Sequence, residues 1–466
     1  MIPTRRDFLA GGFGGLALSH LRATADGPKP LPDFNGGVHH KATVRRVVQV
    51  FLNGGMSQMD TFDYKPVLEK RHGQTVDAGL KATATGTPGP LMKSPFKWKQ
   101  HGKSGRWVTD VFPHLAGHVD DMAFLMAMAS KSSVHGPASY LQSTGFLMPG
   151  MPCAGAWIGY ALGRLTDNLP SFVVLPDPRG LPYNGMGNFS AGFLPASHQG
   201  TVVNPSAPIP IPDLAPSPSA KFVTPAASED GLKLLREMNG KYAIDRAGDS
   251  RLSARVESYE LAAKMQLAAP EVFDLTRESK KTHDLYGTSA PAHEGGFAKN
   301  CLLARRMLER GVRFVQVWSG EGGPKNNWDN HTNIAVELPP IARQVDRPIA
   351  ALLEDLKSKG LFEDTLVVFT TEFGRMPFTQ GGVGRDHNGG TFVTWLAGAG
   401  IQGGVAHGES DEFSHLATKD KTDCYDMHAT ILHLMGINHE KLAVRHDGID
   451  RRLTDVHGHV IEAILT

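Results

Sequence analysis

The stretch RVVQVFLNGG, residues 46–55, decides the fold. It begins with a continuous apolar, β-branched run, which predicts a strand buried on both faces, and its Asn-Gly-Gly end predicts a tight turn. Similar runs alternate with helical patterns along the chain, which predicts an α/β fold with a mostly parallel central sheet and helices on both faces. In such folds, ligand groups gather beyond the carboxyl ends of the strands. The further strands are expected at 171–175, 313–318, 365–370 and 392–397, and helices at 154–162 and 341–359.

The composition allows a large core and excludes few partners. The chain has 466 residues, 41% of them hydrophobic, which is ample for a buried core. Its 48 basic and 47 acidic residues give a net charge of +1, so charge offers no argument for binding nucleic acid or an anionic membrane. Three cysteines, Cys153, Cys301 and Cys424, lie far apart without metal-type spacing, and we expect three buried, inert thiols.

The first 25 residues have the pattern of a twin-arginine signal peptide. Thr4-Arg5-Arg6-Asp7-Phe8-Leu9 precedes a weakly apolar stretch at 10–18, and Ala23-Thr24-Ala25 offers a small-residue cleavage site. This order predicts export of the folded protein to the periplasm or cell envelope. No other segment approaches 18 apolar residues, so we expect a soluble mature protein with no transmembrane segment.

The rest of the chain is interpreted as one unit with a long insertion. Residues 26–43 are rich in proline and glycine and are expected to be a leader into the fold. A single α/β domain is expected over 44–466, with a loop and helical excursion at about 195–310. Within that excursion, residues 195–228 are rich in Pro, Ser and Ala, which is typical of a long surface loop or a lid, and the remainder has helical spacing.

Four groups of polar side chains follow predicted strands or lie in glycine-rich loops. Together they supply Asp, Glu and His at one expected sheet edge, a set that suits Zn²⁺, Mn²⁺ or Ca²⁺. Arg375 and Arg385 have the planar fork that holds an anionic oxyacid. The groups are Gly54–Asp63, Trp328–His331, Thr371–Arg375 and Gly384–Asn388.

Each of these residues also has a structural interpretation, which the sequence leaves open. Asp329 could cap a helix, and Glu372 could form a local ion pair with Arg375. His331 and His387 could be hydrogen-bonded loop histidines.

Several of these motifs resemble those of the alkaline phosphatase and sulfatase superfamily. DTLVVFTTEFG at 364–374 resembles a superfamily motif in which DTLVVFTSD is followed by Asn or His and then Gly, and residues 425–437 are similar to its C-terminal helix. GAGIQGG at 398–404 is similar to its GPGIKGG turn. Nearly the whole mature chain resembles the bacterial sulfatase-like family catalogued as domain of unknown function 1501. The resemblance implies the alkaline-phosphatase-like fold and brings no proven activity. The motifs of the closer family are NGGMSQMDTFD at 53–63, EFGR at 372–375 and GRDH at 384–387.

The chain departs from active sulfatases at the nucleophile. Those enzymes carry Cys or Ser in a Cys-x-Pro-Ser-Arg motif, followed by Thr-Gly. Here Pro137 and Thr144-Gly145 keep their positions, but His135 stands at the nucleophile and Ser139 at the arginine. An imidazole cannot become the formylglycine that sulfatase chemistry needs.

The metal positions implied by the resemblance are shifted as well. The first Asp-Asp pair falls on Asn53-Gly54 and the later pair on Glu372-Phe373, where Phe cannot bind a metal. Asp329 and His331 fall at the middle ligands, and acidic and His residues elsewhere could complete a rearranged site. The expected metal ligands are Asn53, Asp60, Asp329, His331, Glu372, Asp386 and His387, and the expected catalytic residues are His135, Arg375 and Arg385.

Two functions of different classes follow from these patterns. The first is a metal-dependent hydrolase of phosphate or sulfate esters, in which His135 acts as a general base or accepts a phosphoryl group. Phosphoryl transfer is favoured over sulfatase action, because imidazole is a competent phosphoryl acceptor. The alternative is a non-catalytic protein on a sulfatase scaffold that binds sulfated or phosphorylated glycans or belongs to an envelope complex. Another enzyme class with the same metals, such as a mutase or lyase, stays open.

Overall fold

The computed structural model describes residues 38–76, 88–205 and 271–466, together with isolated positions between 211 and 241. The signal peptide expected at 1–25, most of the leader and much of the 195–310 excursion lie outside the described residues. Two helices of that excursion are described, α7 (Lys280–Tyr286) and α8 (Ala292–Glu309).

A central sheet of eight strands organises the described residues, in the order β12-β4-β11-β8-β1-β7-β5-β6. β1 lies between β7 and β8 and pairs in parallel with both, with Val50 opposite Val317 and Phe369. β11 is antiparallel to both β8 and β4, and the remaining pairs are parallel. The predicted mostly parallel sheet is therefore confirmed. The strands are β1 (Arg46–Leu52), β4 (Met122–Met128), β5 (Phe172–Leu175), β6 (Thr201–Val202), β7 (Phe314–Ser319), β8 (Thr365–Thr371), β11 (Phe392–Gly398) and β12 (Ala406–His407).

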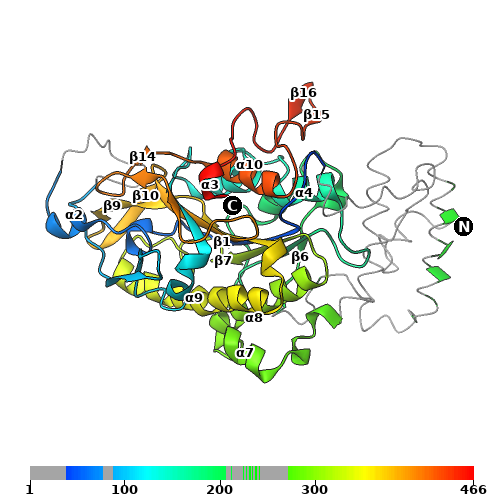
Figure 1. Ribbon diagram of the computed structural model, residues 1–466, viewed down its shortest axis with the longest axis horizontal. Coiled ribbons are helices and arrows are strands. Elements are labelled where there is room, and N and C mark those ends of the chain that lie inside the picture. The colour runs from blue at the N-terminus through cyan, green and yellow to red at the C-terminus, as the bar shows by residue number, and fades with distance from the viewer. Residues whose placement is uncertain are drawn as a thin grey trace, which may run out of the picture.

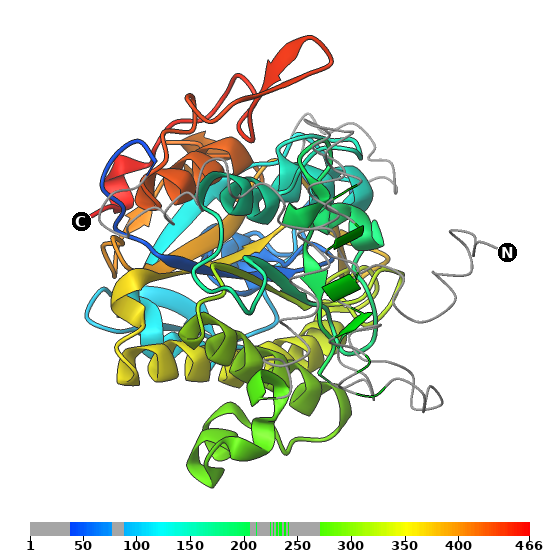
Figure 2. The same ribbon diagram turned by 90° about the vertical axis from the view of Figure 1, so that its right-hand side faces the viewer.

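Helices cover both faces of this sheet. Figures 1 and 2 show α8 and α9 (Ile334–Ser358) along one face, with α3 (His135–Thr144), α4 (Ala154–Leu162) and α10 (Cys424–Leu434) on the other. Every residue of β1 and β8 is buried, as expected for strands covered on both sides. All three cysteines are free and buried, as predicted, and burial raises the pKa of Cys153 to about 12.

Smaller elements surround this core. Short 3₁₀ turns link the main elements, including one over Leu115–Asp121 before β4. The remaining elements are α2 (Pro66–Lys70) and the strand pairs β2 (Trp98–His101) with β3 (Arg106–Thr109), β9 (Gly374–Gln380) with β10 (Gly384–Asn388), β13 (Glu409–Ser410) with β14 (Ala417–Lys419), and β15 (Val444–His446) with β16 (Ile449–Arg451).

Two differences from the sequence prediction bear on the site. Helix α9 begins at Ile334, before Pro339 and Pro340, although an interior proline normally ends a helix. The Asn333 side chain accepts the N–H of Ala335 and caps this earlier start. The GRDH motif, predicted to lie in a loop, forms strand β10, which pairs antiparallel with β9 and places His387 opposite Arg375.

Candidate metal centre

The candidate centre lies where the turns after several strands meet the start of α3. Asn53 follows β1, Asp329 lies in the loop after β7, and Glu372 follows β8. His135 is the first residue of α3, and His387 lies on β10. Gly54 lets these turns approach, because a Cβ there would lie 2.6 Å from the backbone nitrogen of Trp328 and 2.7 Å from that of Asp329. Its φ of +121° is also one that side-chain-bearing residues rarely adopt.

One carboxylate oxygen, Oδ1 of Asp329, is the focus of the cluster. The Nε2 atoms of His331, His387 and His135 lie 2.7, 3.0 and 3.3 Å from it. Nη2 of Arg375 donates to the same oxygen at 2.6 Å. Although His135 Nε2 is near this oxygen, it is buried without a hydrogen-bond partner.

The other ring nitrogen of each histidine faces an acceptor. Nδ1 of His135 lies 2.7 Å from Oε1 of Glu372, and Nδ1 of His387 lies 2.8 Å from the carbonyl oxygen of Ser133. Nδ1 of His331 faces Oε1 of Gln380. In a neutral ring with its proton on Nδ1, the Nε2 lone pair faces Asp329, whereas a protonated ring donates from Nε2 to the same oxygen. Such outer hydrogen bonds are the usual orienting device of metal-binding histidines.

Burial and neighbouring charges shift the pKa values of the residues in the cluster. Burial alone would raise the pKa of Asp329, but hydrogen bonds from His135, His331 and His387 and the charge of Arg375 hold it far below its usual range. Burial works to lower the pKa of His135, yet the Asp329 and Glu372 carboxylates outweigh it and raise that pKa. The pKa of His387 is lowered by burial and by the neighbouring Arg375 and His135.

Aromatic rings enclose the cluster on the side of His135. Tyr183 stacks on the His135 ring, with centroids 4.4 Å apart and planes 6° from parallel. Phe373 is fully buried, and its centroid lies 4.9 Å from that of His135 and 4.7 Å from that of His387. The position where the resemblance implies a second metal ligand therefore holds an apolar ring against two imidazoles.

The two arginines that were predicted to be catalytic donate hydrogen bonds to acceptors within the protein. Arg375 is fully buried and donates to the carbonyl oxygens of Gly54, Gly55 and Trp328 as well as to Asp329. Arg385 donates to Oδ2 of Asp60 at 2.6 Å and to Oδ1 at 3.2 Å. Neither guanidinium can clamp an oxyanion without breaking these bonds.

The other expected ligands lie around the cluster rather than in it. Asp60 is fully buried with Arg385 as its ion-pair partner. Asp386 accepts the backbone N–H of His387. Asn53 donates from Nδ2 to the carbonyl oxygen of Glu321, and its Oδ1 is buried with no hydrogen-bond partner. Among the described residues, the carboxylate, imidazole and thiol groups close enough to share one ion are His135, Asp329 and His387.

Sequence reasoning missed the residues that shape this cluster. Tyr183, Gln380 and the carbonyl of Ser133 belong to no motif, and no pattern in the sequence marks them. Glu372 was expected to bind a metal, whereas its Oε1 accepts from His135 and from the backbone N–H of Gly54 at 2.8 Å.

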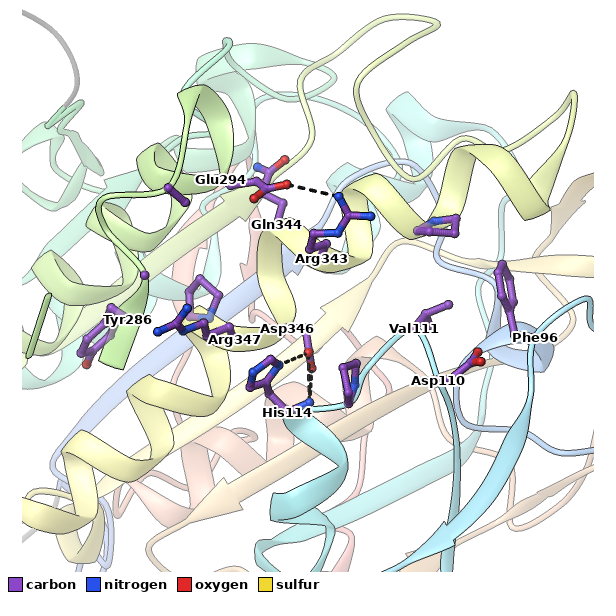
Figure 3. A pocket seen from close by; sticks show the side chains of 15 residues that line it. Phe96, Asp110, Val111, His114, Tyr286, Glu294, Arg343, Gln344, Asp346 and Arg347 are labelled. Carbon is purple, nitrogen blue, oxygen red and sulfur yellow. Dashed lines mark hydrogen bonds and ion pairs between the residues drawn. The ribbon is translucent and has the colours of Figure 1, made fainter. Parts of the chain in front are cut away.

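Two pockets flank the start of α9. One, of about 560 Å³, is lined by Asp329 and Asn330 and so reaches the candidate centre. The other, of about 540 Å³, contains none of the predicted site residues. Figure 3 shows its His114 ring held by Asp346, with Nδ1 2.7 Å from Oδ2.

Fold and site together define an α/β protein with a candidate metal centre at the carboxyl edge of its sheet. The chain belongs to the family described as Protein of unknown function (DUF1501), whose model matches residues 44–465. A comparison with curated proteins finds no match. No helix in the described part of the chain is long and apolar enough to cross a membrane.

Solved structures similar to the chain include a lipoteichoic acid synthase, a sulfatase and an alkaline phosphatase. The lipoteichoic acid synthase LtaP from Listeria monocytogenes is 10% identical, with 93% of this chain and 78% of that chain covered and a TM-score of 0.36. The PsFucS1 sulfatase from Pseudoalteromonas sp. is 14% identical, with 85% and 68% covered and a TM-score of 0.36. The alkaline phosphatase from the Antarctic bacterium TAB5 is 13% identical, with 80% and 96% covered and a TM-score of 0.30.

Proposed function

We propose that the protein is an exported, metal-dependent hydrolase of phosphate or sulfate esters, with a divalent ion held by His135, Asp329 and His387. One observation carries this proposal. Imidazole Nε2 atoms, each with an acceptor at its Nδ1, converge on one carboxylate oxygen. Two imidazoles and a carboxylate at this spacing, with the outer ring nitrogens held by acceptors, form a donor set that fits a metal.

The types of donor atom narrow the choice of metal ion. Two or three imidazoles with one carboxylate suit Zn²⁺ or Mn²⁺, whereas Ca²⁺ prefers six to eight oxygen ligands. His331 is the neighbouring third imidazole, with its Nε2 2.9 Å from that of His387. A divalent ion bound there supplies Lewis acidity toward an ester oxygen.

The remaining residues have roles that their contacts suggest. Both nitrogens of His135 are engaged, by Glu372 and at the Asp329 cluster, so we assign it to the metal rather than to a phosphoryl acceptor. Arg375 orients Asp329 and balances its charge. Tyr183 and Phe373 keep water away from the His135 ring.

The Arg375–Asp329 ion pair favours a second candidate function. A guanidinium 2.6 Å from Oδ1 neutralises the carboxylate without any metal. A metal-free protein that binds anionic glycans in the same place is therefore the alternative function.

The export part of the proposal is supported by the sequence. The Arg5-Arg6 motif, the apolar stretch and the small-residue site occur in the order of a twin-arginine leader. This route places the protein in the periplasm or envelope.

Metal content decides between the two functions. Protein purified without chelator is expected to hold zinc or manganese near stoichiometry by mass spectrometry, and His387→Ala is expected to lose it. His415→Ala is the matched control, because it removes an imidazole that lies outside the cluster. The loaded protein is then expected to hydrolyse p-nitrophenyl phosphate or sulfate. Metal-free wild-type protein would overturn the hydrolase and leave the binding protein in its place.

A further inference from the structure

The β2–β3 hairpin and the loop that leads into it carry an excess of positive charge. Residues 93–109 contain five basic side chains and no Asp or Glu, whereas the whole chain has a net charge of only +1. The four lysines are exposed, and none of the five basic residues forms an ion pair within the part of the chain that the structure describes. Their charges therefore remain available to an anion. The five are Lys93, Lys97, Lys99, Lys103 and Arg106.

Two acidic side chains bond to the backbone of this hairpin. Asp110 accepts the N–H of Lys97 through Oδ1 at 3.2 Å. Asp120 accepts the N–H of Lys103 through Oδ2 at 2.7 Å and that of the next residue through Oδ1 at 2.9 Å. Gly102 lets the turn close on Asp120, because its φ is +66° and a Cβ there would lie 2.5 Å from Oδ1. These bonds fix the turn that presents Lys103, and two carboxylates offset only part of the charge of five bases.

Aromatic rings lie beside these cations. Trp98 and Gln100 are two positions apart on β2, and Trp107 on β3 lies opposite Gln100, so both tryptophans are on the same face of the hairpin. The ring of Tyr64 packs against both, with its centroid 5.3 Å from that of Trp98 and 4.4 Å from that of Trp107. Trp107 nevertheless keeps 37% of its surface exposed. The hairpin therefore presents a firmly packed aromatic surface together with its lysines.

The arrangement of these groups indicates the kind of partner. The basic residues extend from the base of the hairpin to its turn instead of converging on one point, which favours a chain of anions over a single small one. Indole and phenol rings provide large, rigid contacts at a small cost in conformational entropy. A sugar ring has an apolar face of C–H groups that fits such a contact. A polymer that combines sugar rings with negative groups therefore matches both features.

We propose that the β2–β3 hairpin is a docking surface for an anionic polysaccharide, whose sulfate or carboxylate groups bind the lysines and whose sugar rings contact Trp107. None of these residues belongs to the cluster around Asp329. Docking at this surface does not depend on the proposed hydrolase, because it needs no metal. An acidic protein segment, a single-stranded nucleic acid and an anionic membrane are the competing partners of the same charge.

The test titrates fluorescently labelled dextran sulfate and polygalacturonate into the chelator-treated protein at about 150 mM salt, where charges are screened beyond about 8 Å. We expect at least one of them to bind about tenfold or more tightly than neutral dextran, and the tighter one identifies the anionic group. The combined substitutions Lys97→Gln, Lys99→Gln and Lys103→Gln are expected to weaken that binding about tenfold or more and to make it less sensitive to salt. The matched control, with Lys41→Gln, Lys281→Gln and Lys441→Gln, removes three charges from exposed lysines outside the hairpin and is expected to leave the affinity unchanged.

A second variant tests the sugar contact. Trp107→Ala is expected to weaken binding of the same polysaccharide about fivefold, while polyvinyl sulfonate, which has the charges but no sugar rings, binds as before. Polyglutamate, single-stranded DNA and phosphatidylglycerol vesicles are compared in the same assay. Equal or tighter binding of any of these three, an unaffected lysine variant, an equal loss in the control, or no binding of either polysaccharide would overturn the docking surface. Failure of the hydrolase proposal would show in metal content and ester cleavage, which this metal-free titration does not measure.

Discussion

Replacing Asp60 by Asn separates a structural role from a metal-binding one. The carboxylate of Asp60 is fully buried and makes a two-bond ion pair with Arg385, at 2.6 and 3.2 Å. Removing one partner of a buried ion pair costs about 3–5 kcal/mol, because the other charge is left uncompensated. For a chain of 466 residues, an unfolding entropy of about 2.1 cal/mol/K per residue gives about 1 kcal/mol/K. The melting temperature should therefore fall by about 3–5 °C.

Thermal unfolding followed by circular dichroism measures this shift, and metal content is measured on the same samples. Glu409→Gln is the matched control, since its ion pair with Lys419 is exposed and such pairs contribute about 0–1 kcal/mol. We expect Asp60→Asn to unfold at a lower temperature than the wild-type protein. We expect it to keep its metal at temperatures below that unfolding transition. A variant with unchanged melting temperature and no metal would refute this reasoning and make Asp60 a ligand.

Three further predictions concern the centre, the core and the leader. Glu372→Gln should weaken metal binding about 10–100-fold in a chelator competition, because a neutral amide oxygen is a weaker acceptor for the His135 proton than the carboxylate; unchanged affinity would contradict that role. Burial lowers the pKa of His428 to about 4, so the unfolded chain binds its proton first, and stability should fall by about 1.4 kcal/mol per unit as the pH drops from about 6.5 to 4. His428→Gln, which can still donate to the Gln142 carbonyl, should flatten this dependence in melts across that range; an equal slope would argue against it. Arg5→Lys with Arg6→Lys should retain the precursor in the cytoplasm by cell fractionation, and normal export would exclude the twin-arginine route.

The sheet could be predicted because its signal is local. β1 and β8 are continuous apolar runs with turn residues at their ends, and α4 was predicted with the bounds that it has. The β9–β10 hairpin was missed because its sequence is polar and interrupted by glycine. Its pairing depends on distant contacts, such as the Gln58 amide, which bonds to both the N–H and the carbonyl of Arg375.

The candidate site could be predicted in composition but not in arrangement. Offsets to a motif placed Asp329, His331 and His387 near one edge, and the structure brings their side chains together. The same offsets could not show that Arg385 turns toward Asp60, because that pair joins residues 325 positions apart. They also could not distinguish a histidine in the nucleophile position from a histidine in a metal set, since this depends on what its Nδ1 faces.

Phe373 links the departures in the sequence to the geometry of the centre. With an oxygen or nitrogen ligand there, the residues after β8 would offer donors to a second ion. Instead, Glu372 turns its Oε1 to His135, and the Phe373 ring packs against both His135 and His387. Gly55 makes room for that ring, because a Cβ at Gly55 would lie 2.6 Å from it. The loss of one ligand, the histidine in the nucleophile position and the glycine beneath the ring are therefore parts of one arrangement, which favours a single ion bound by imidazoles over a pair bridged by carboxylates.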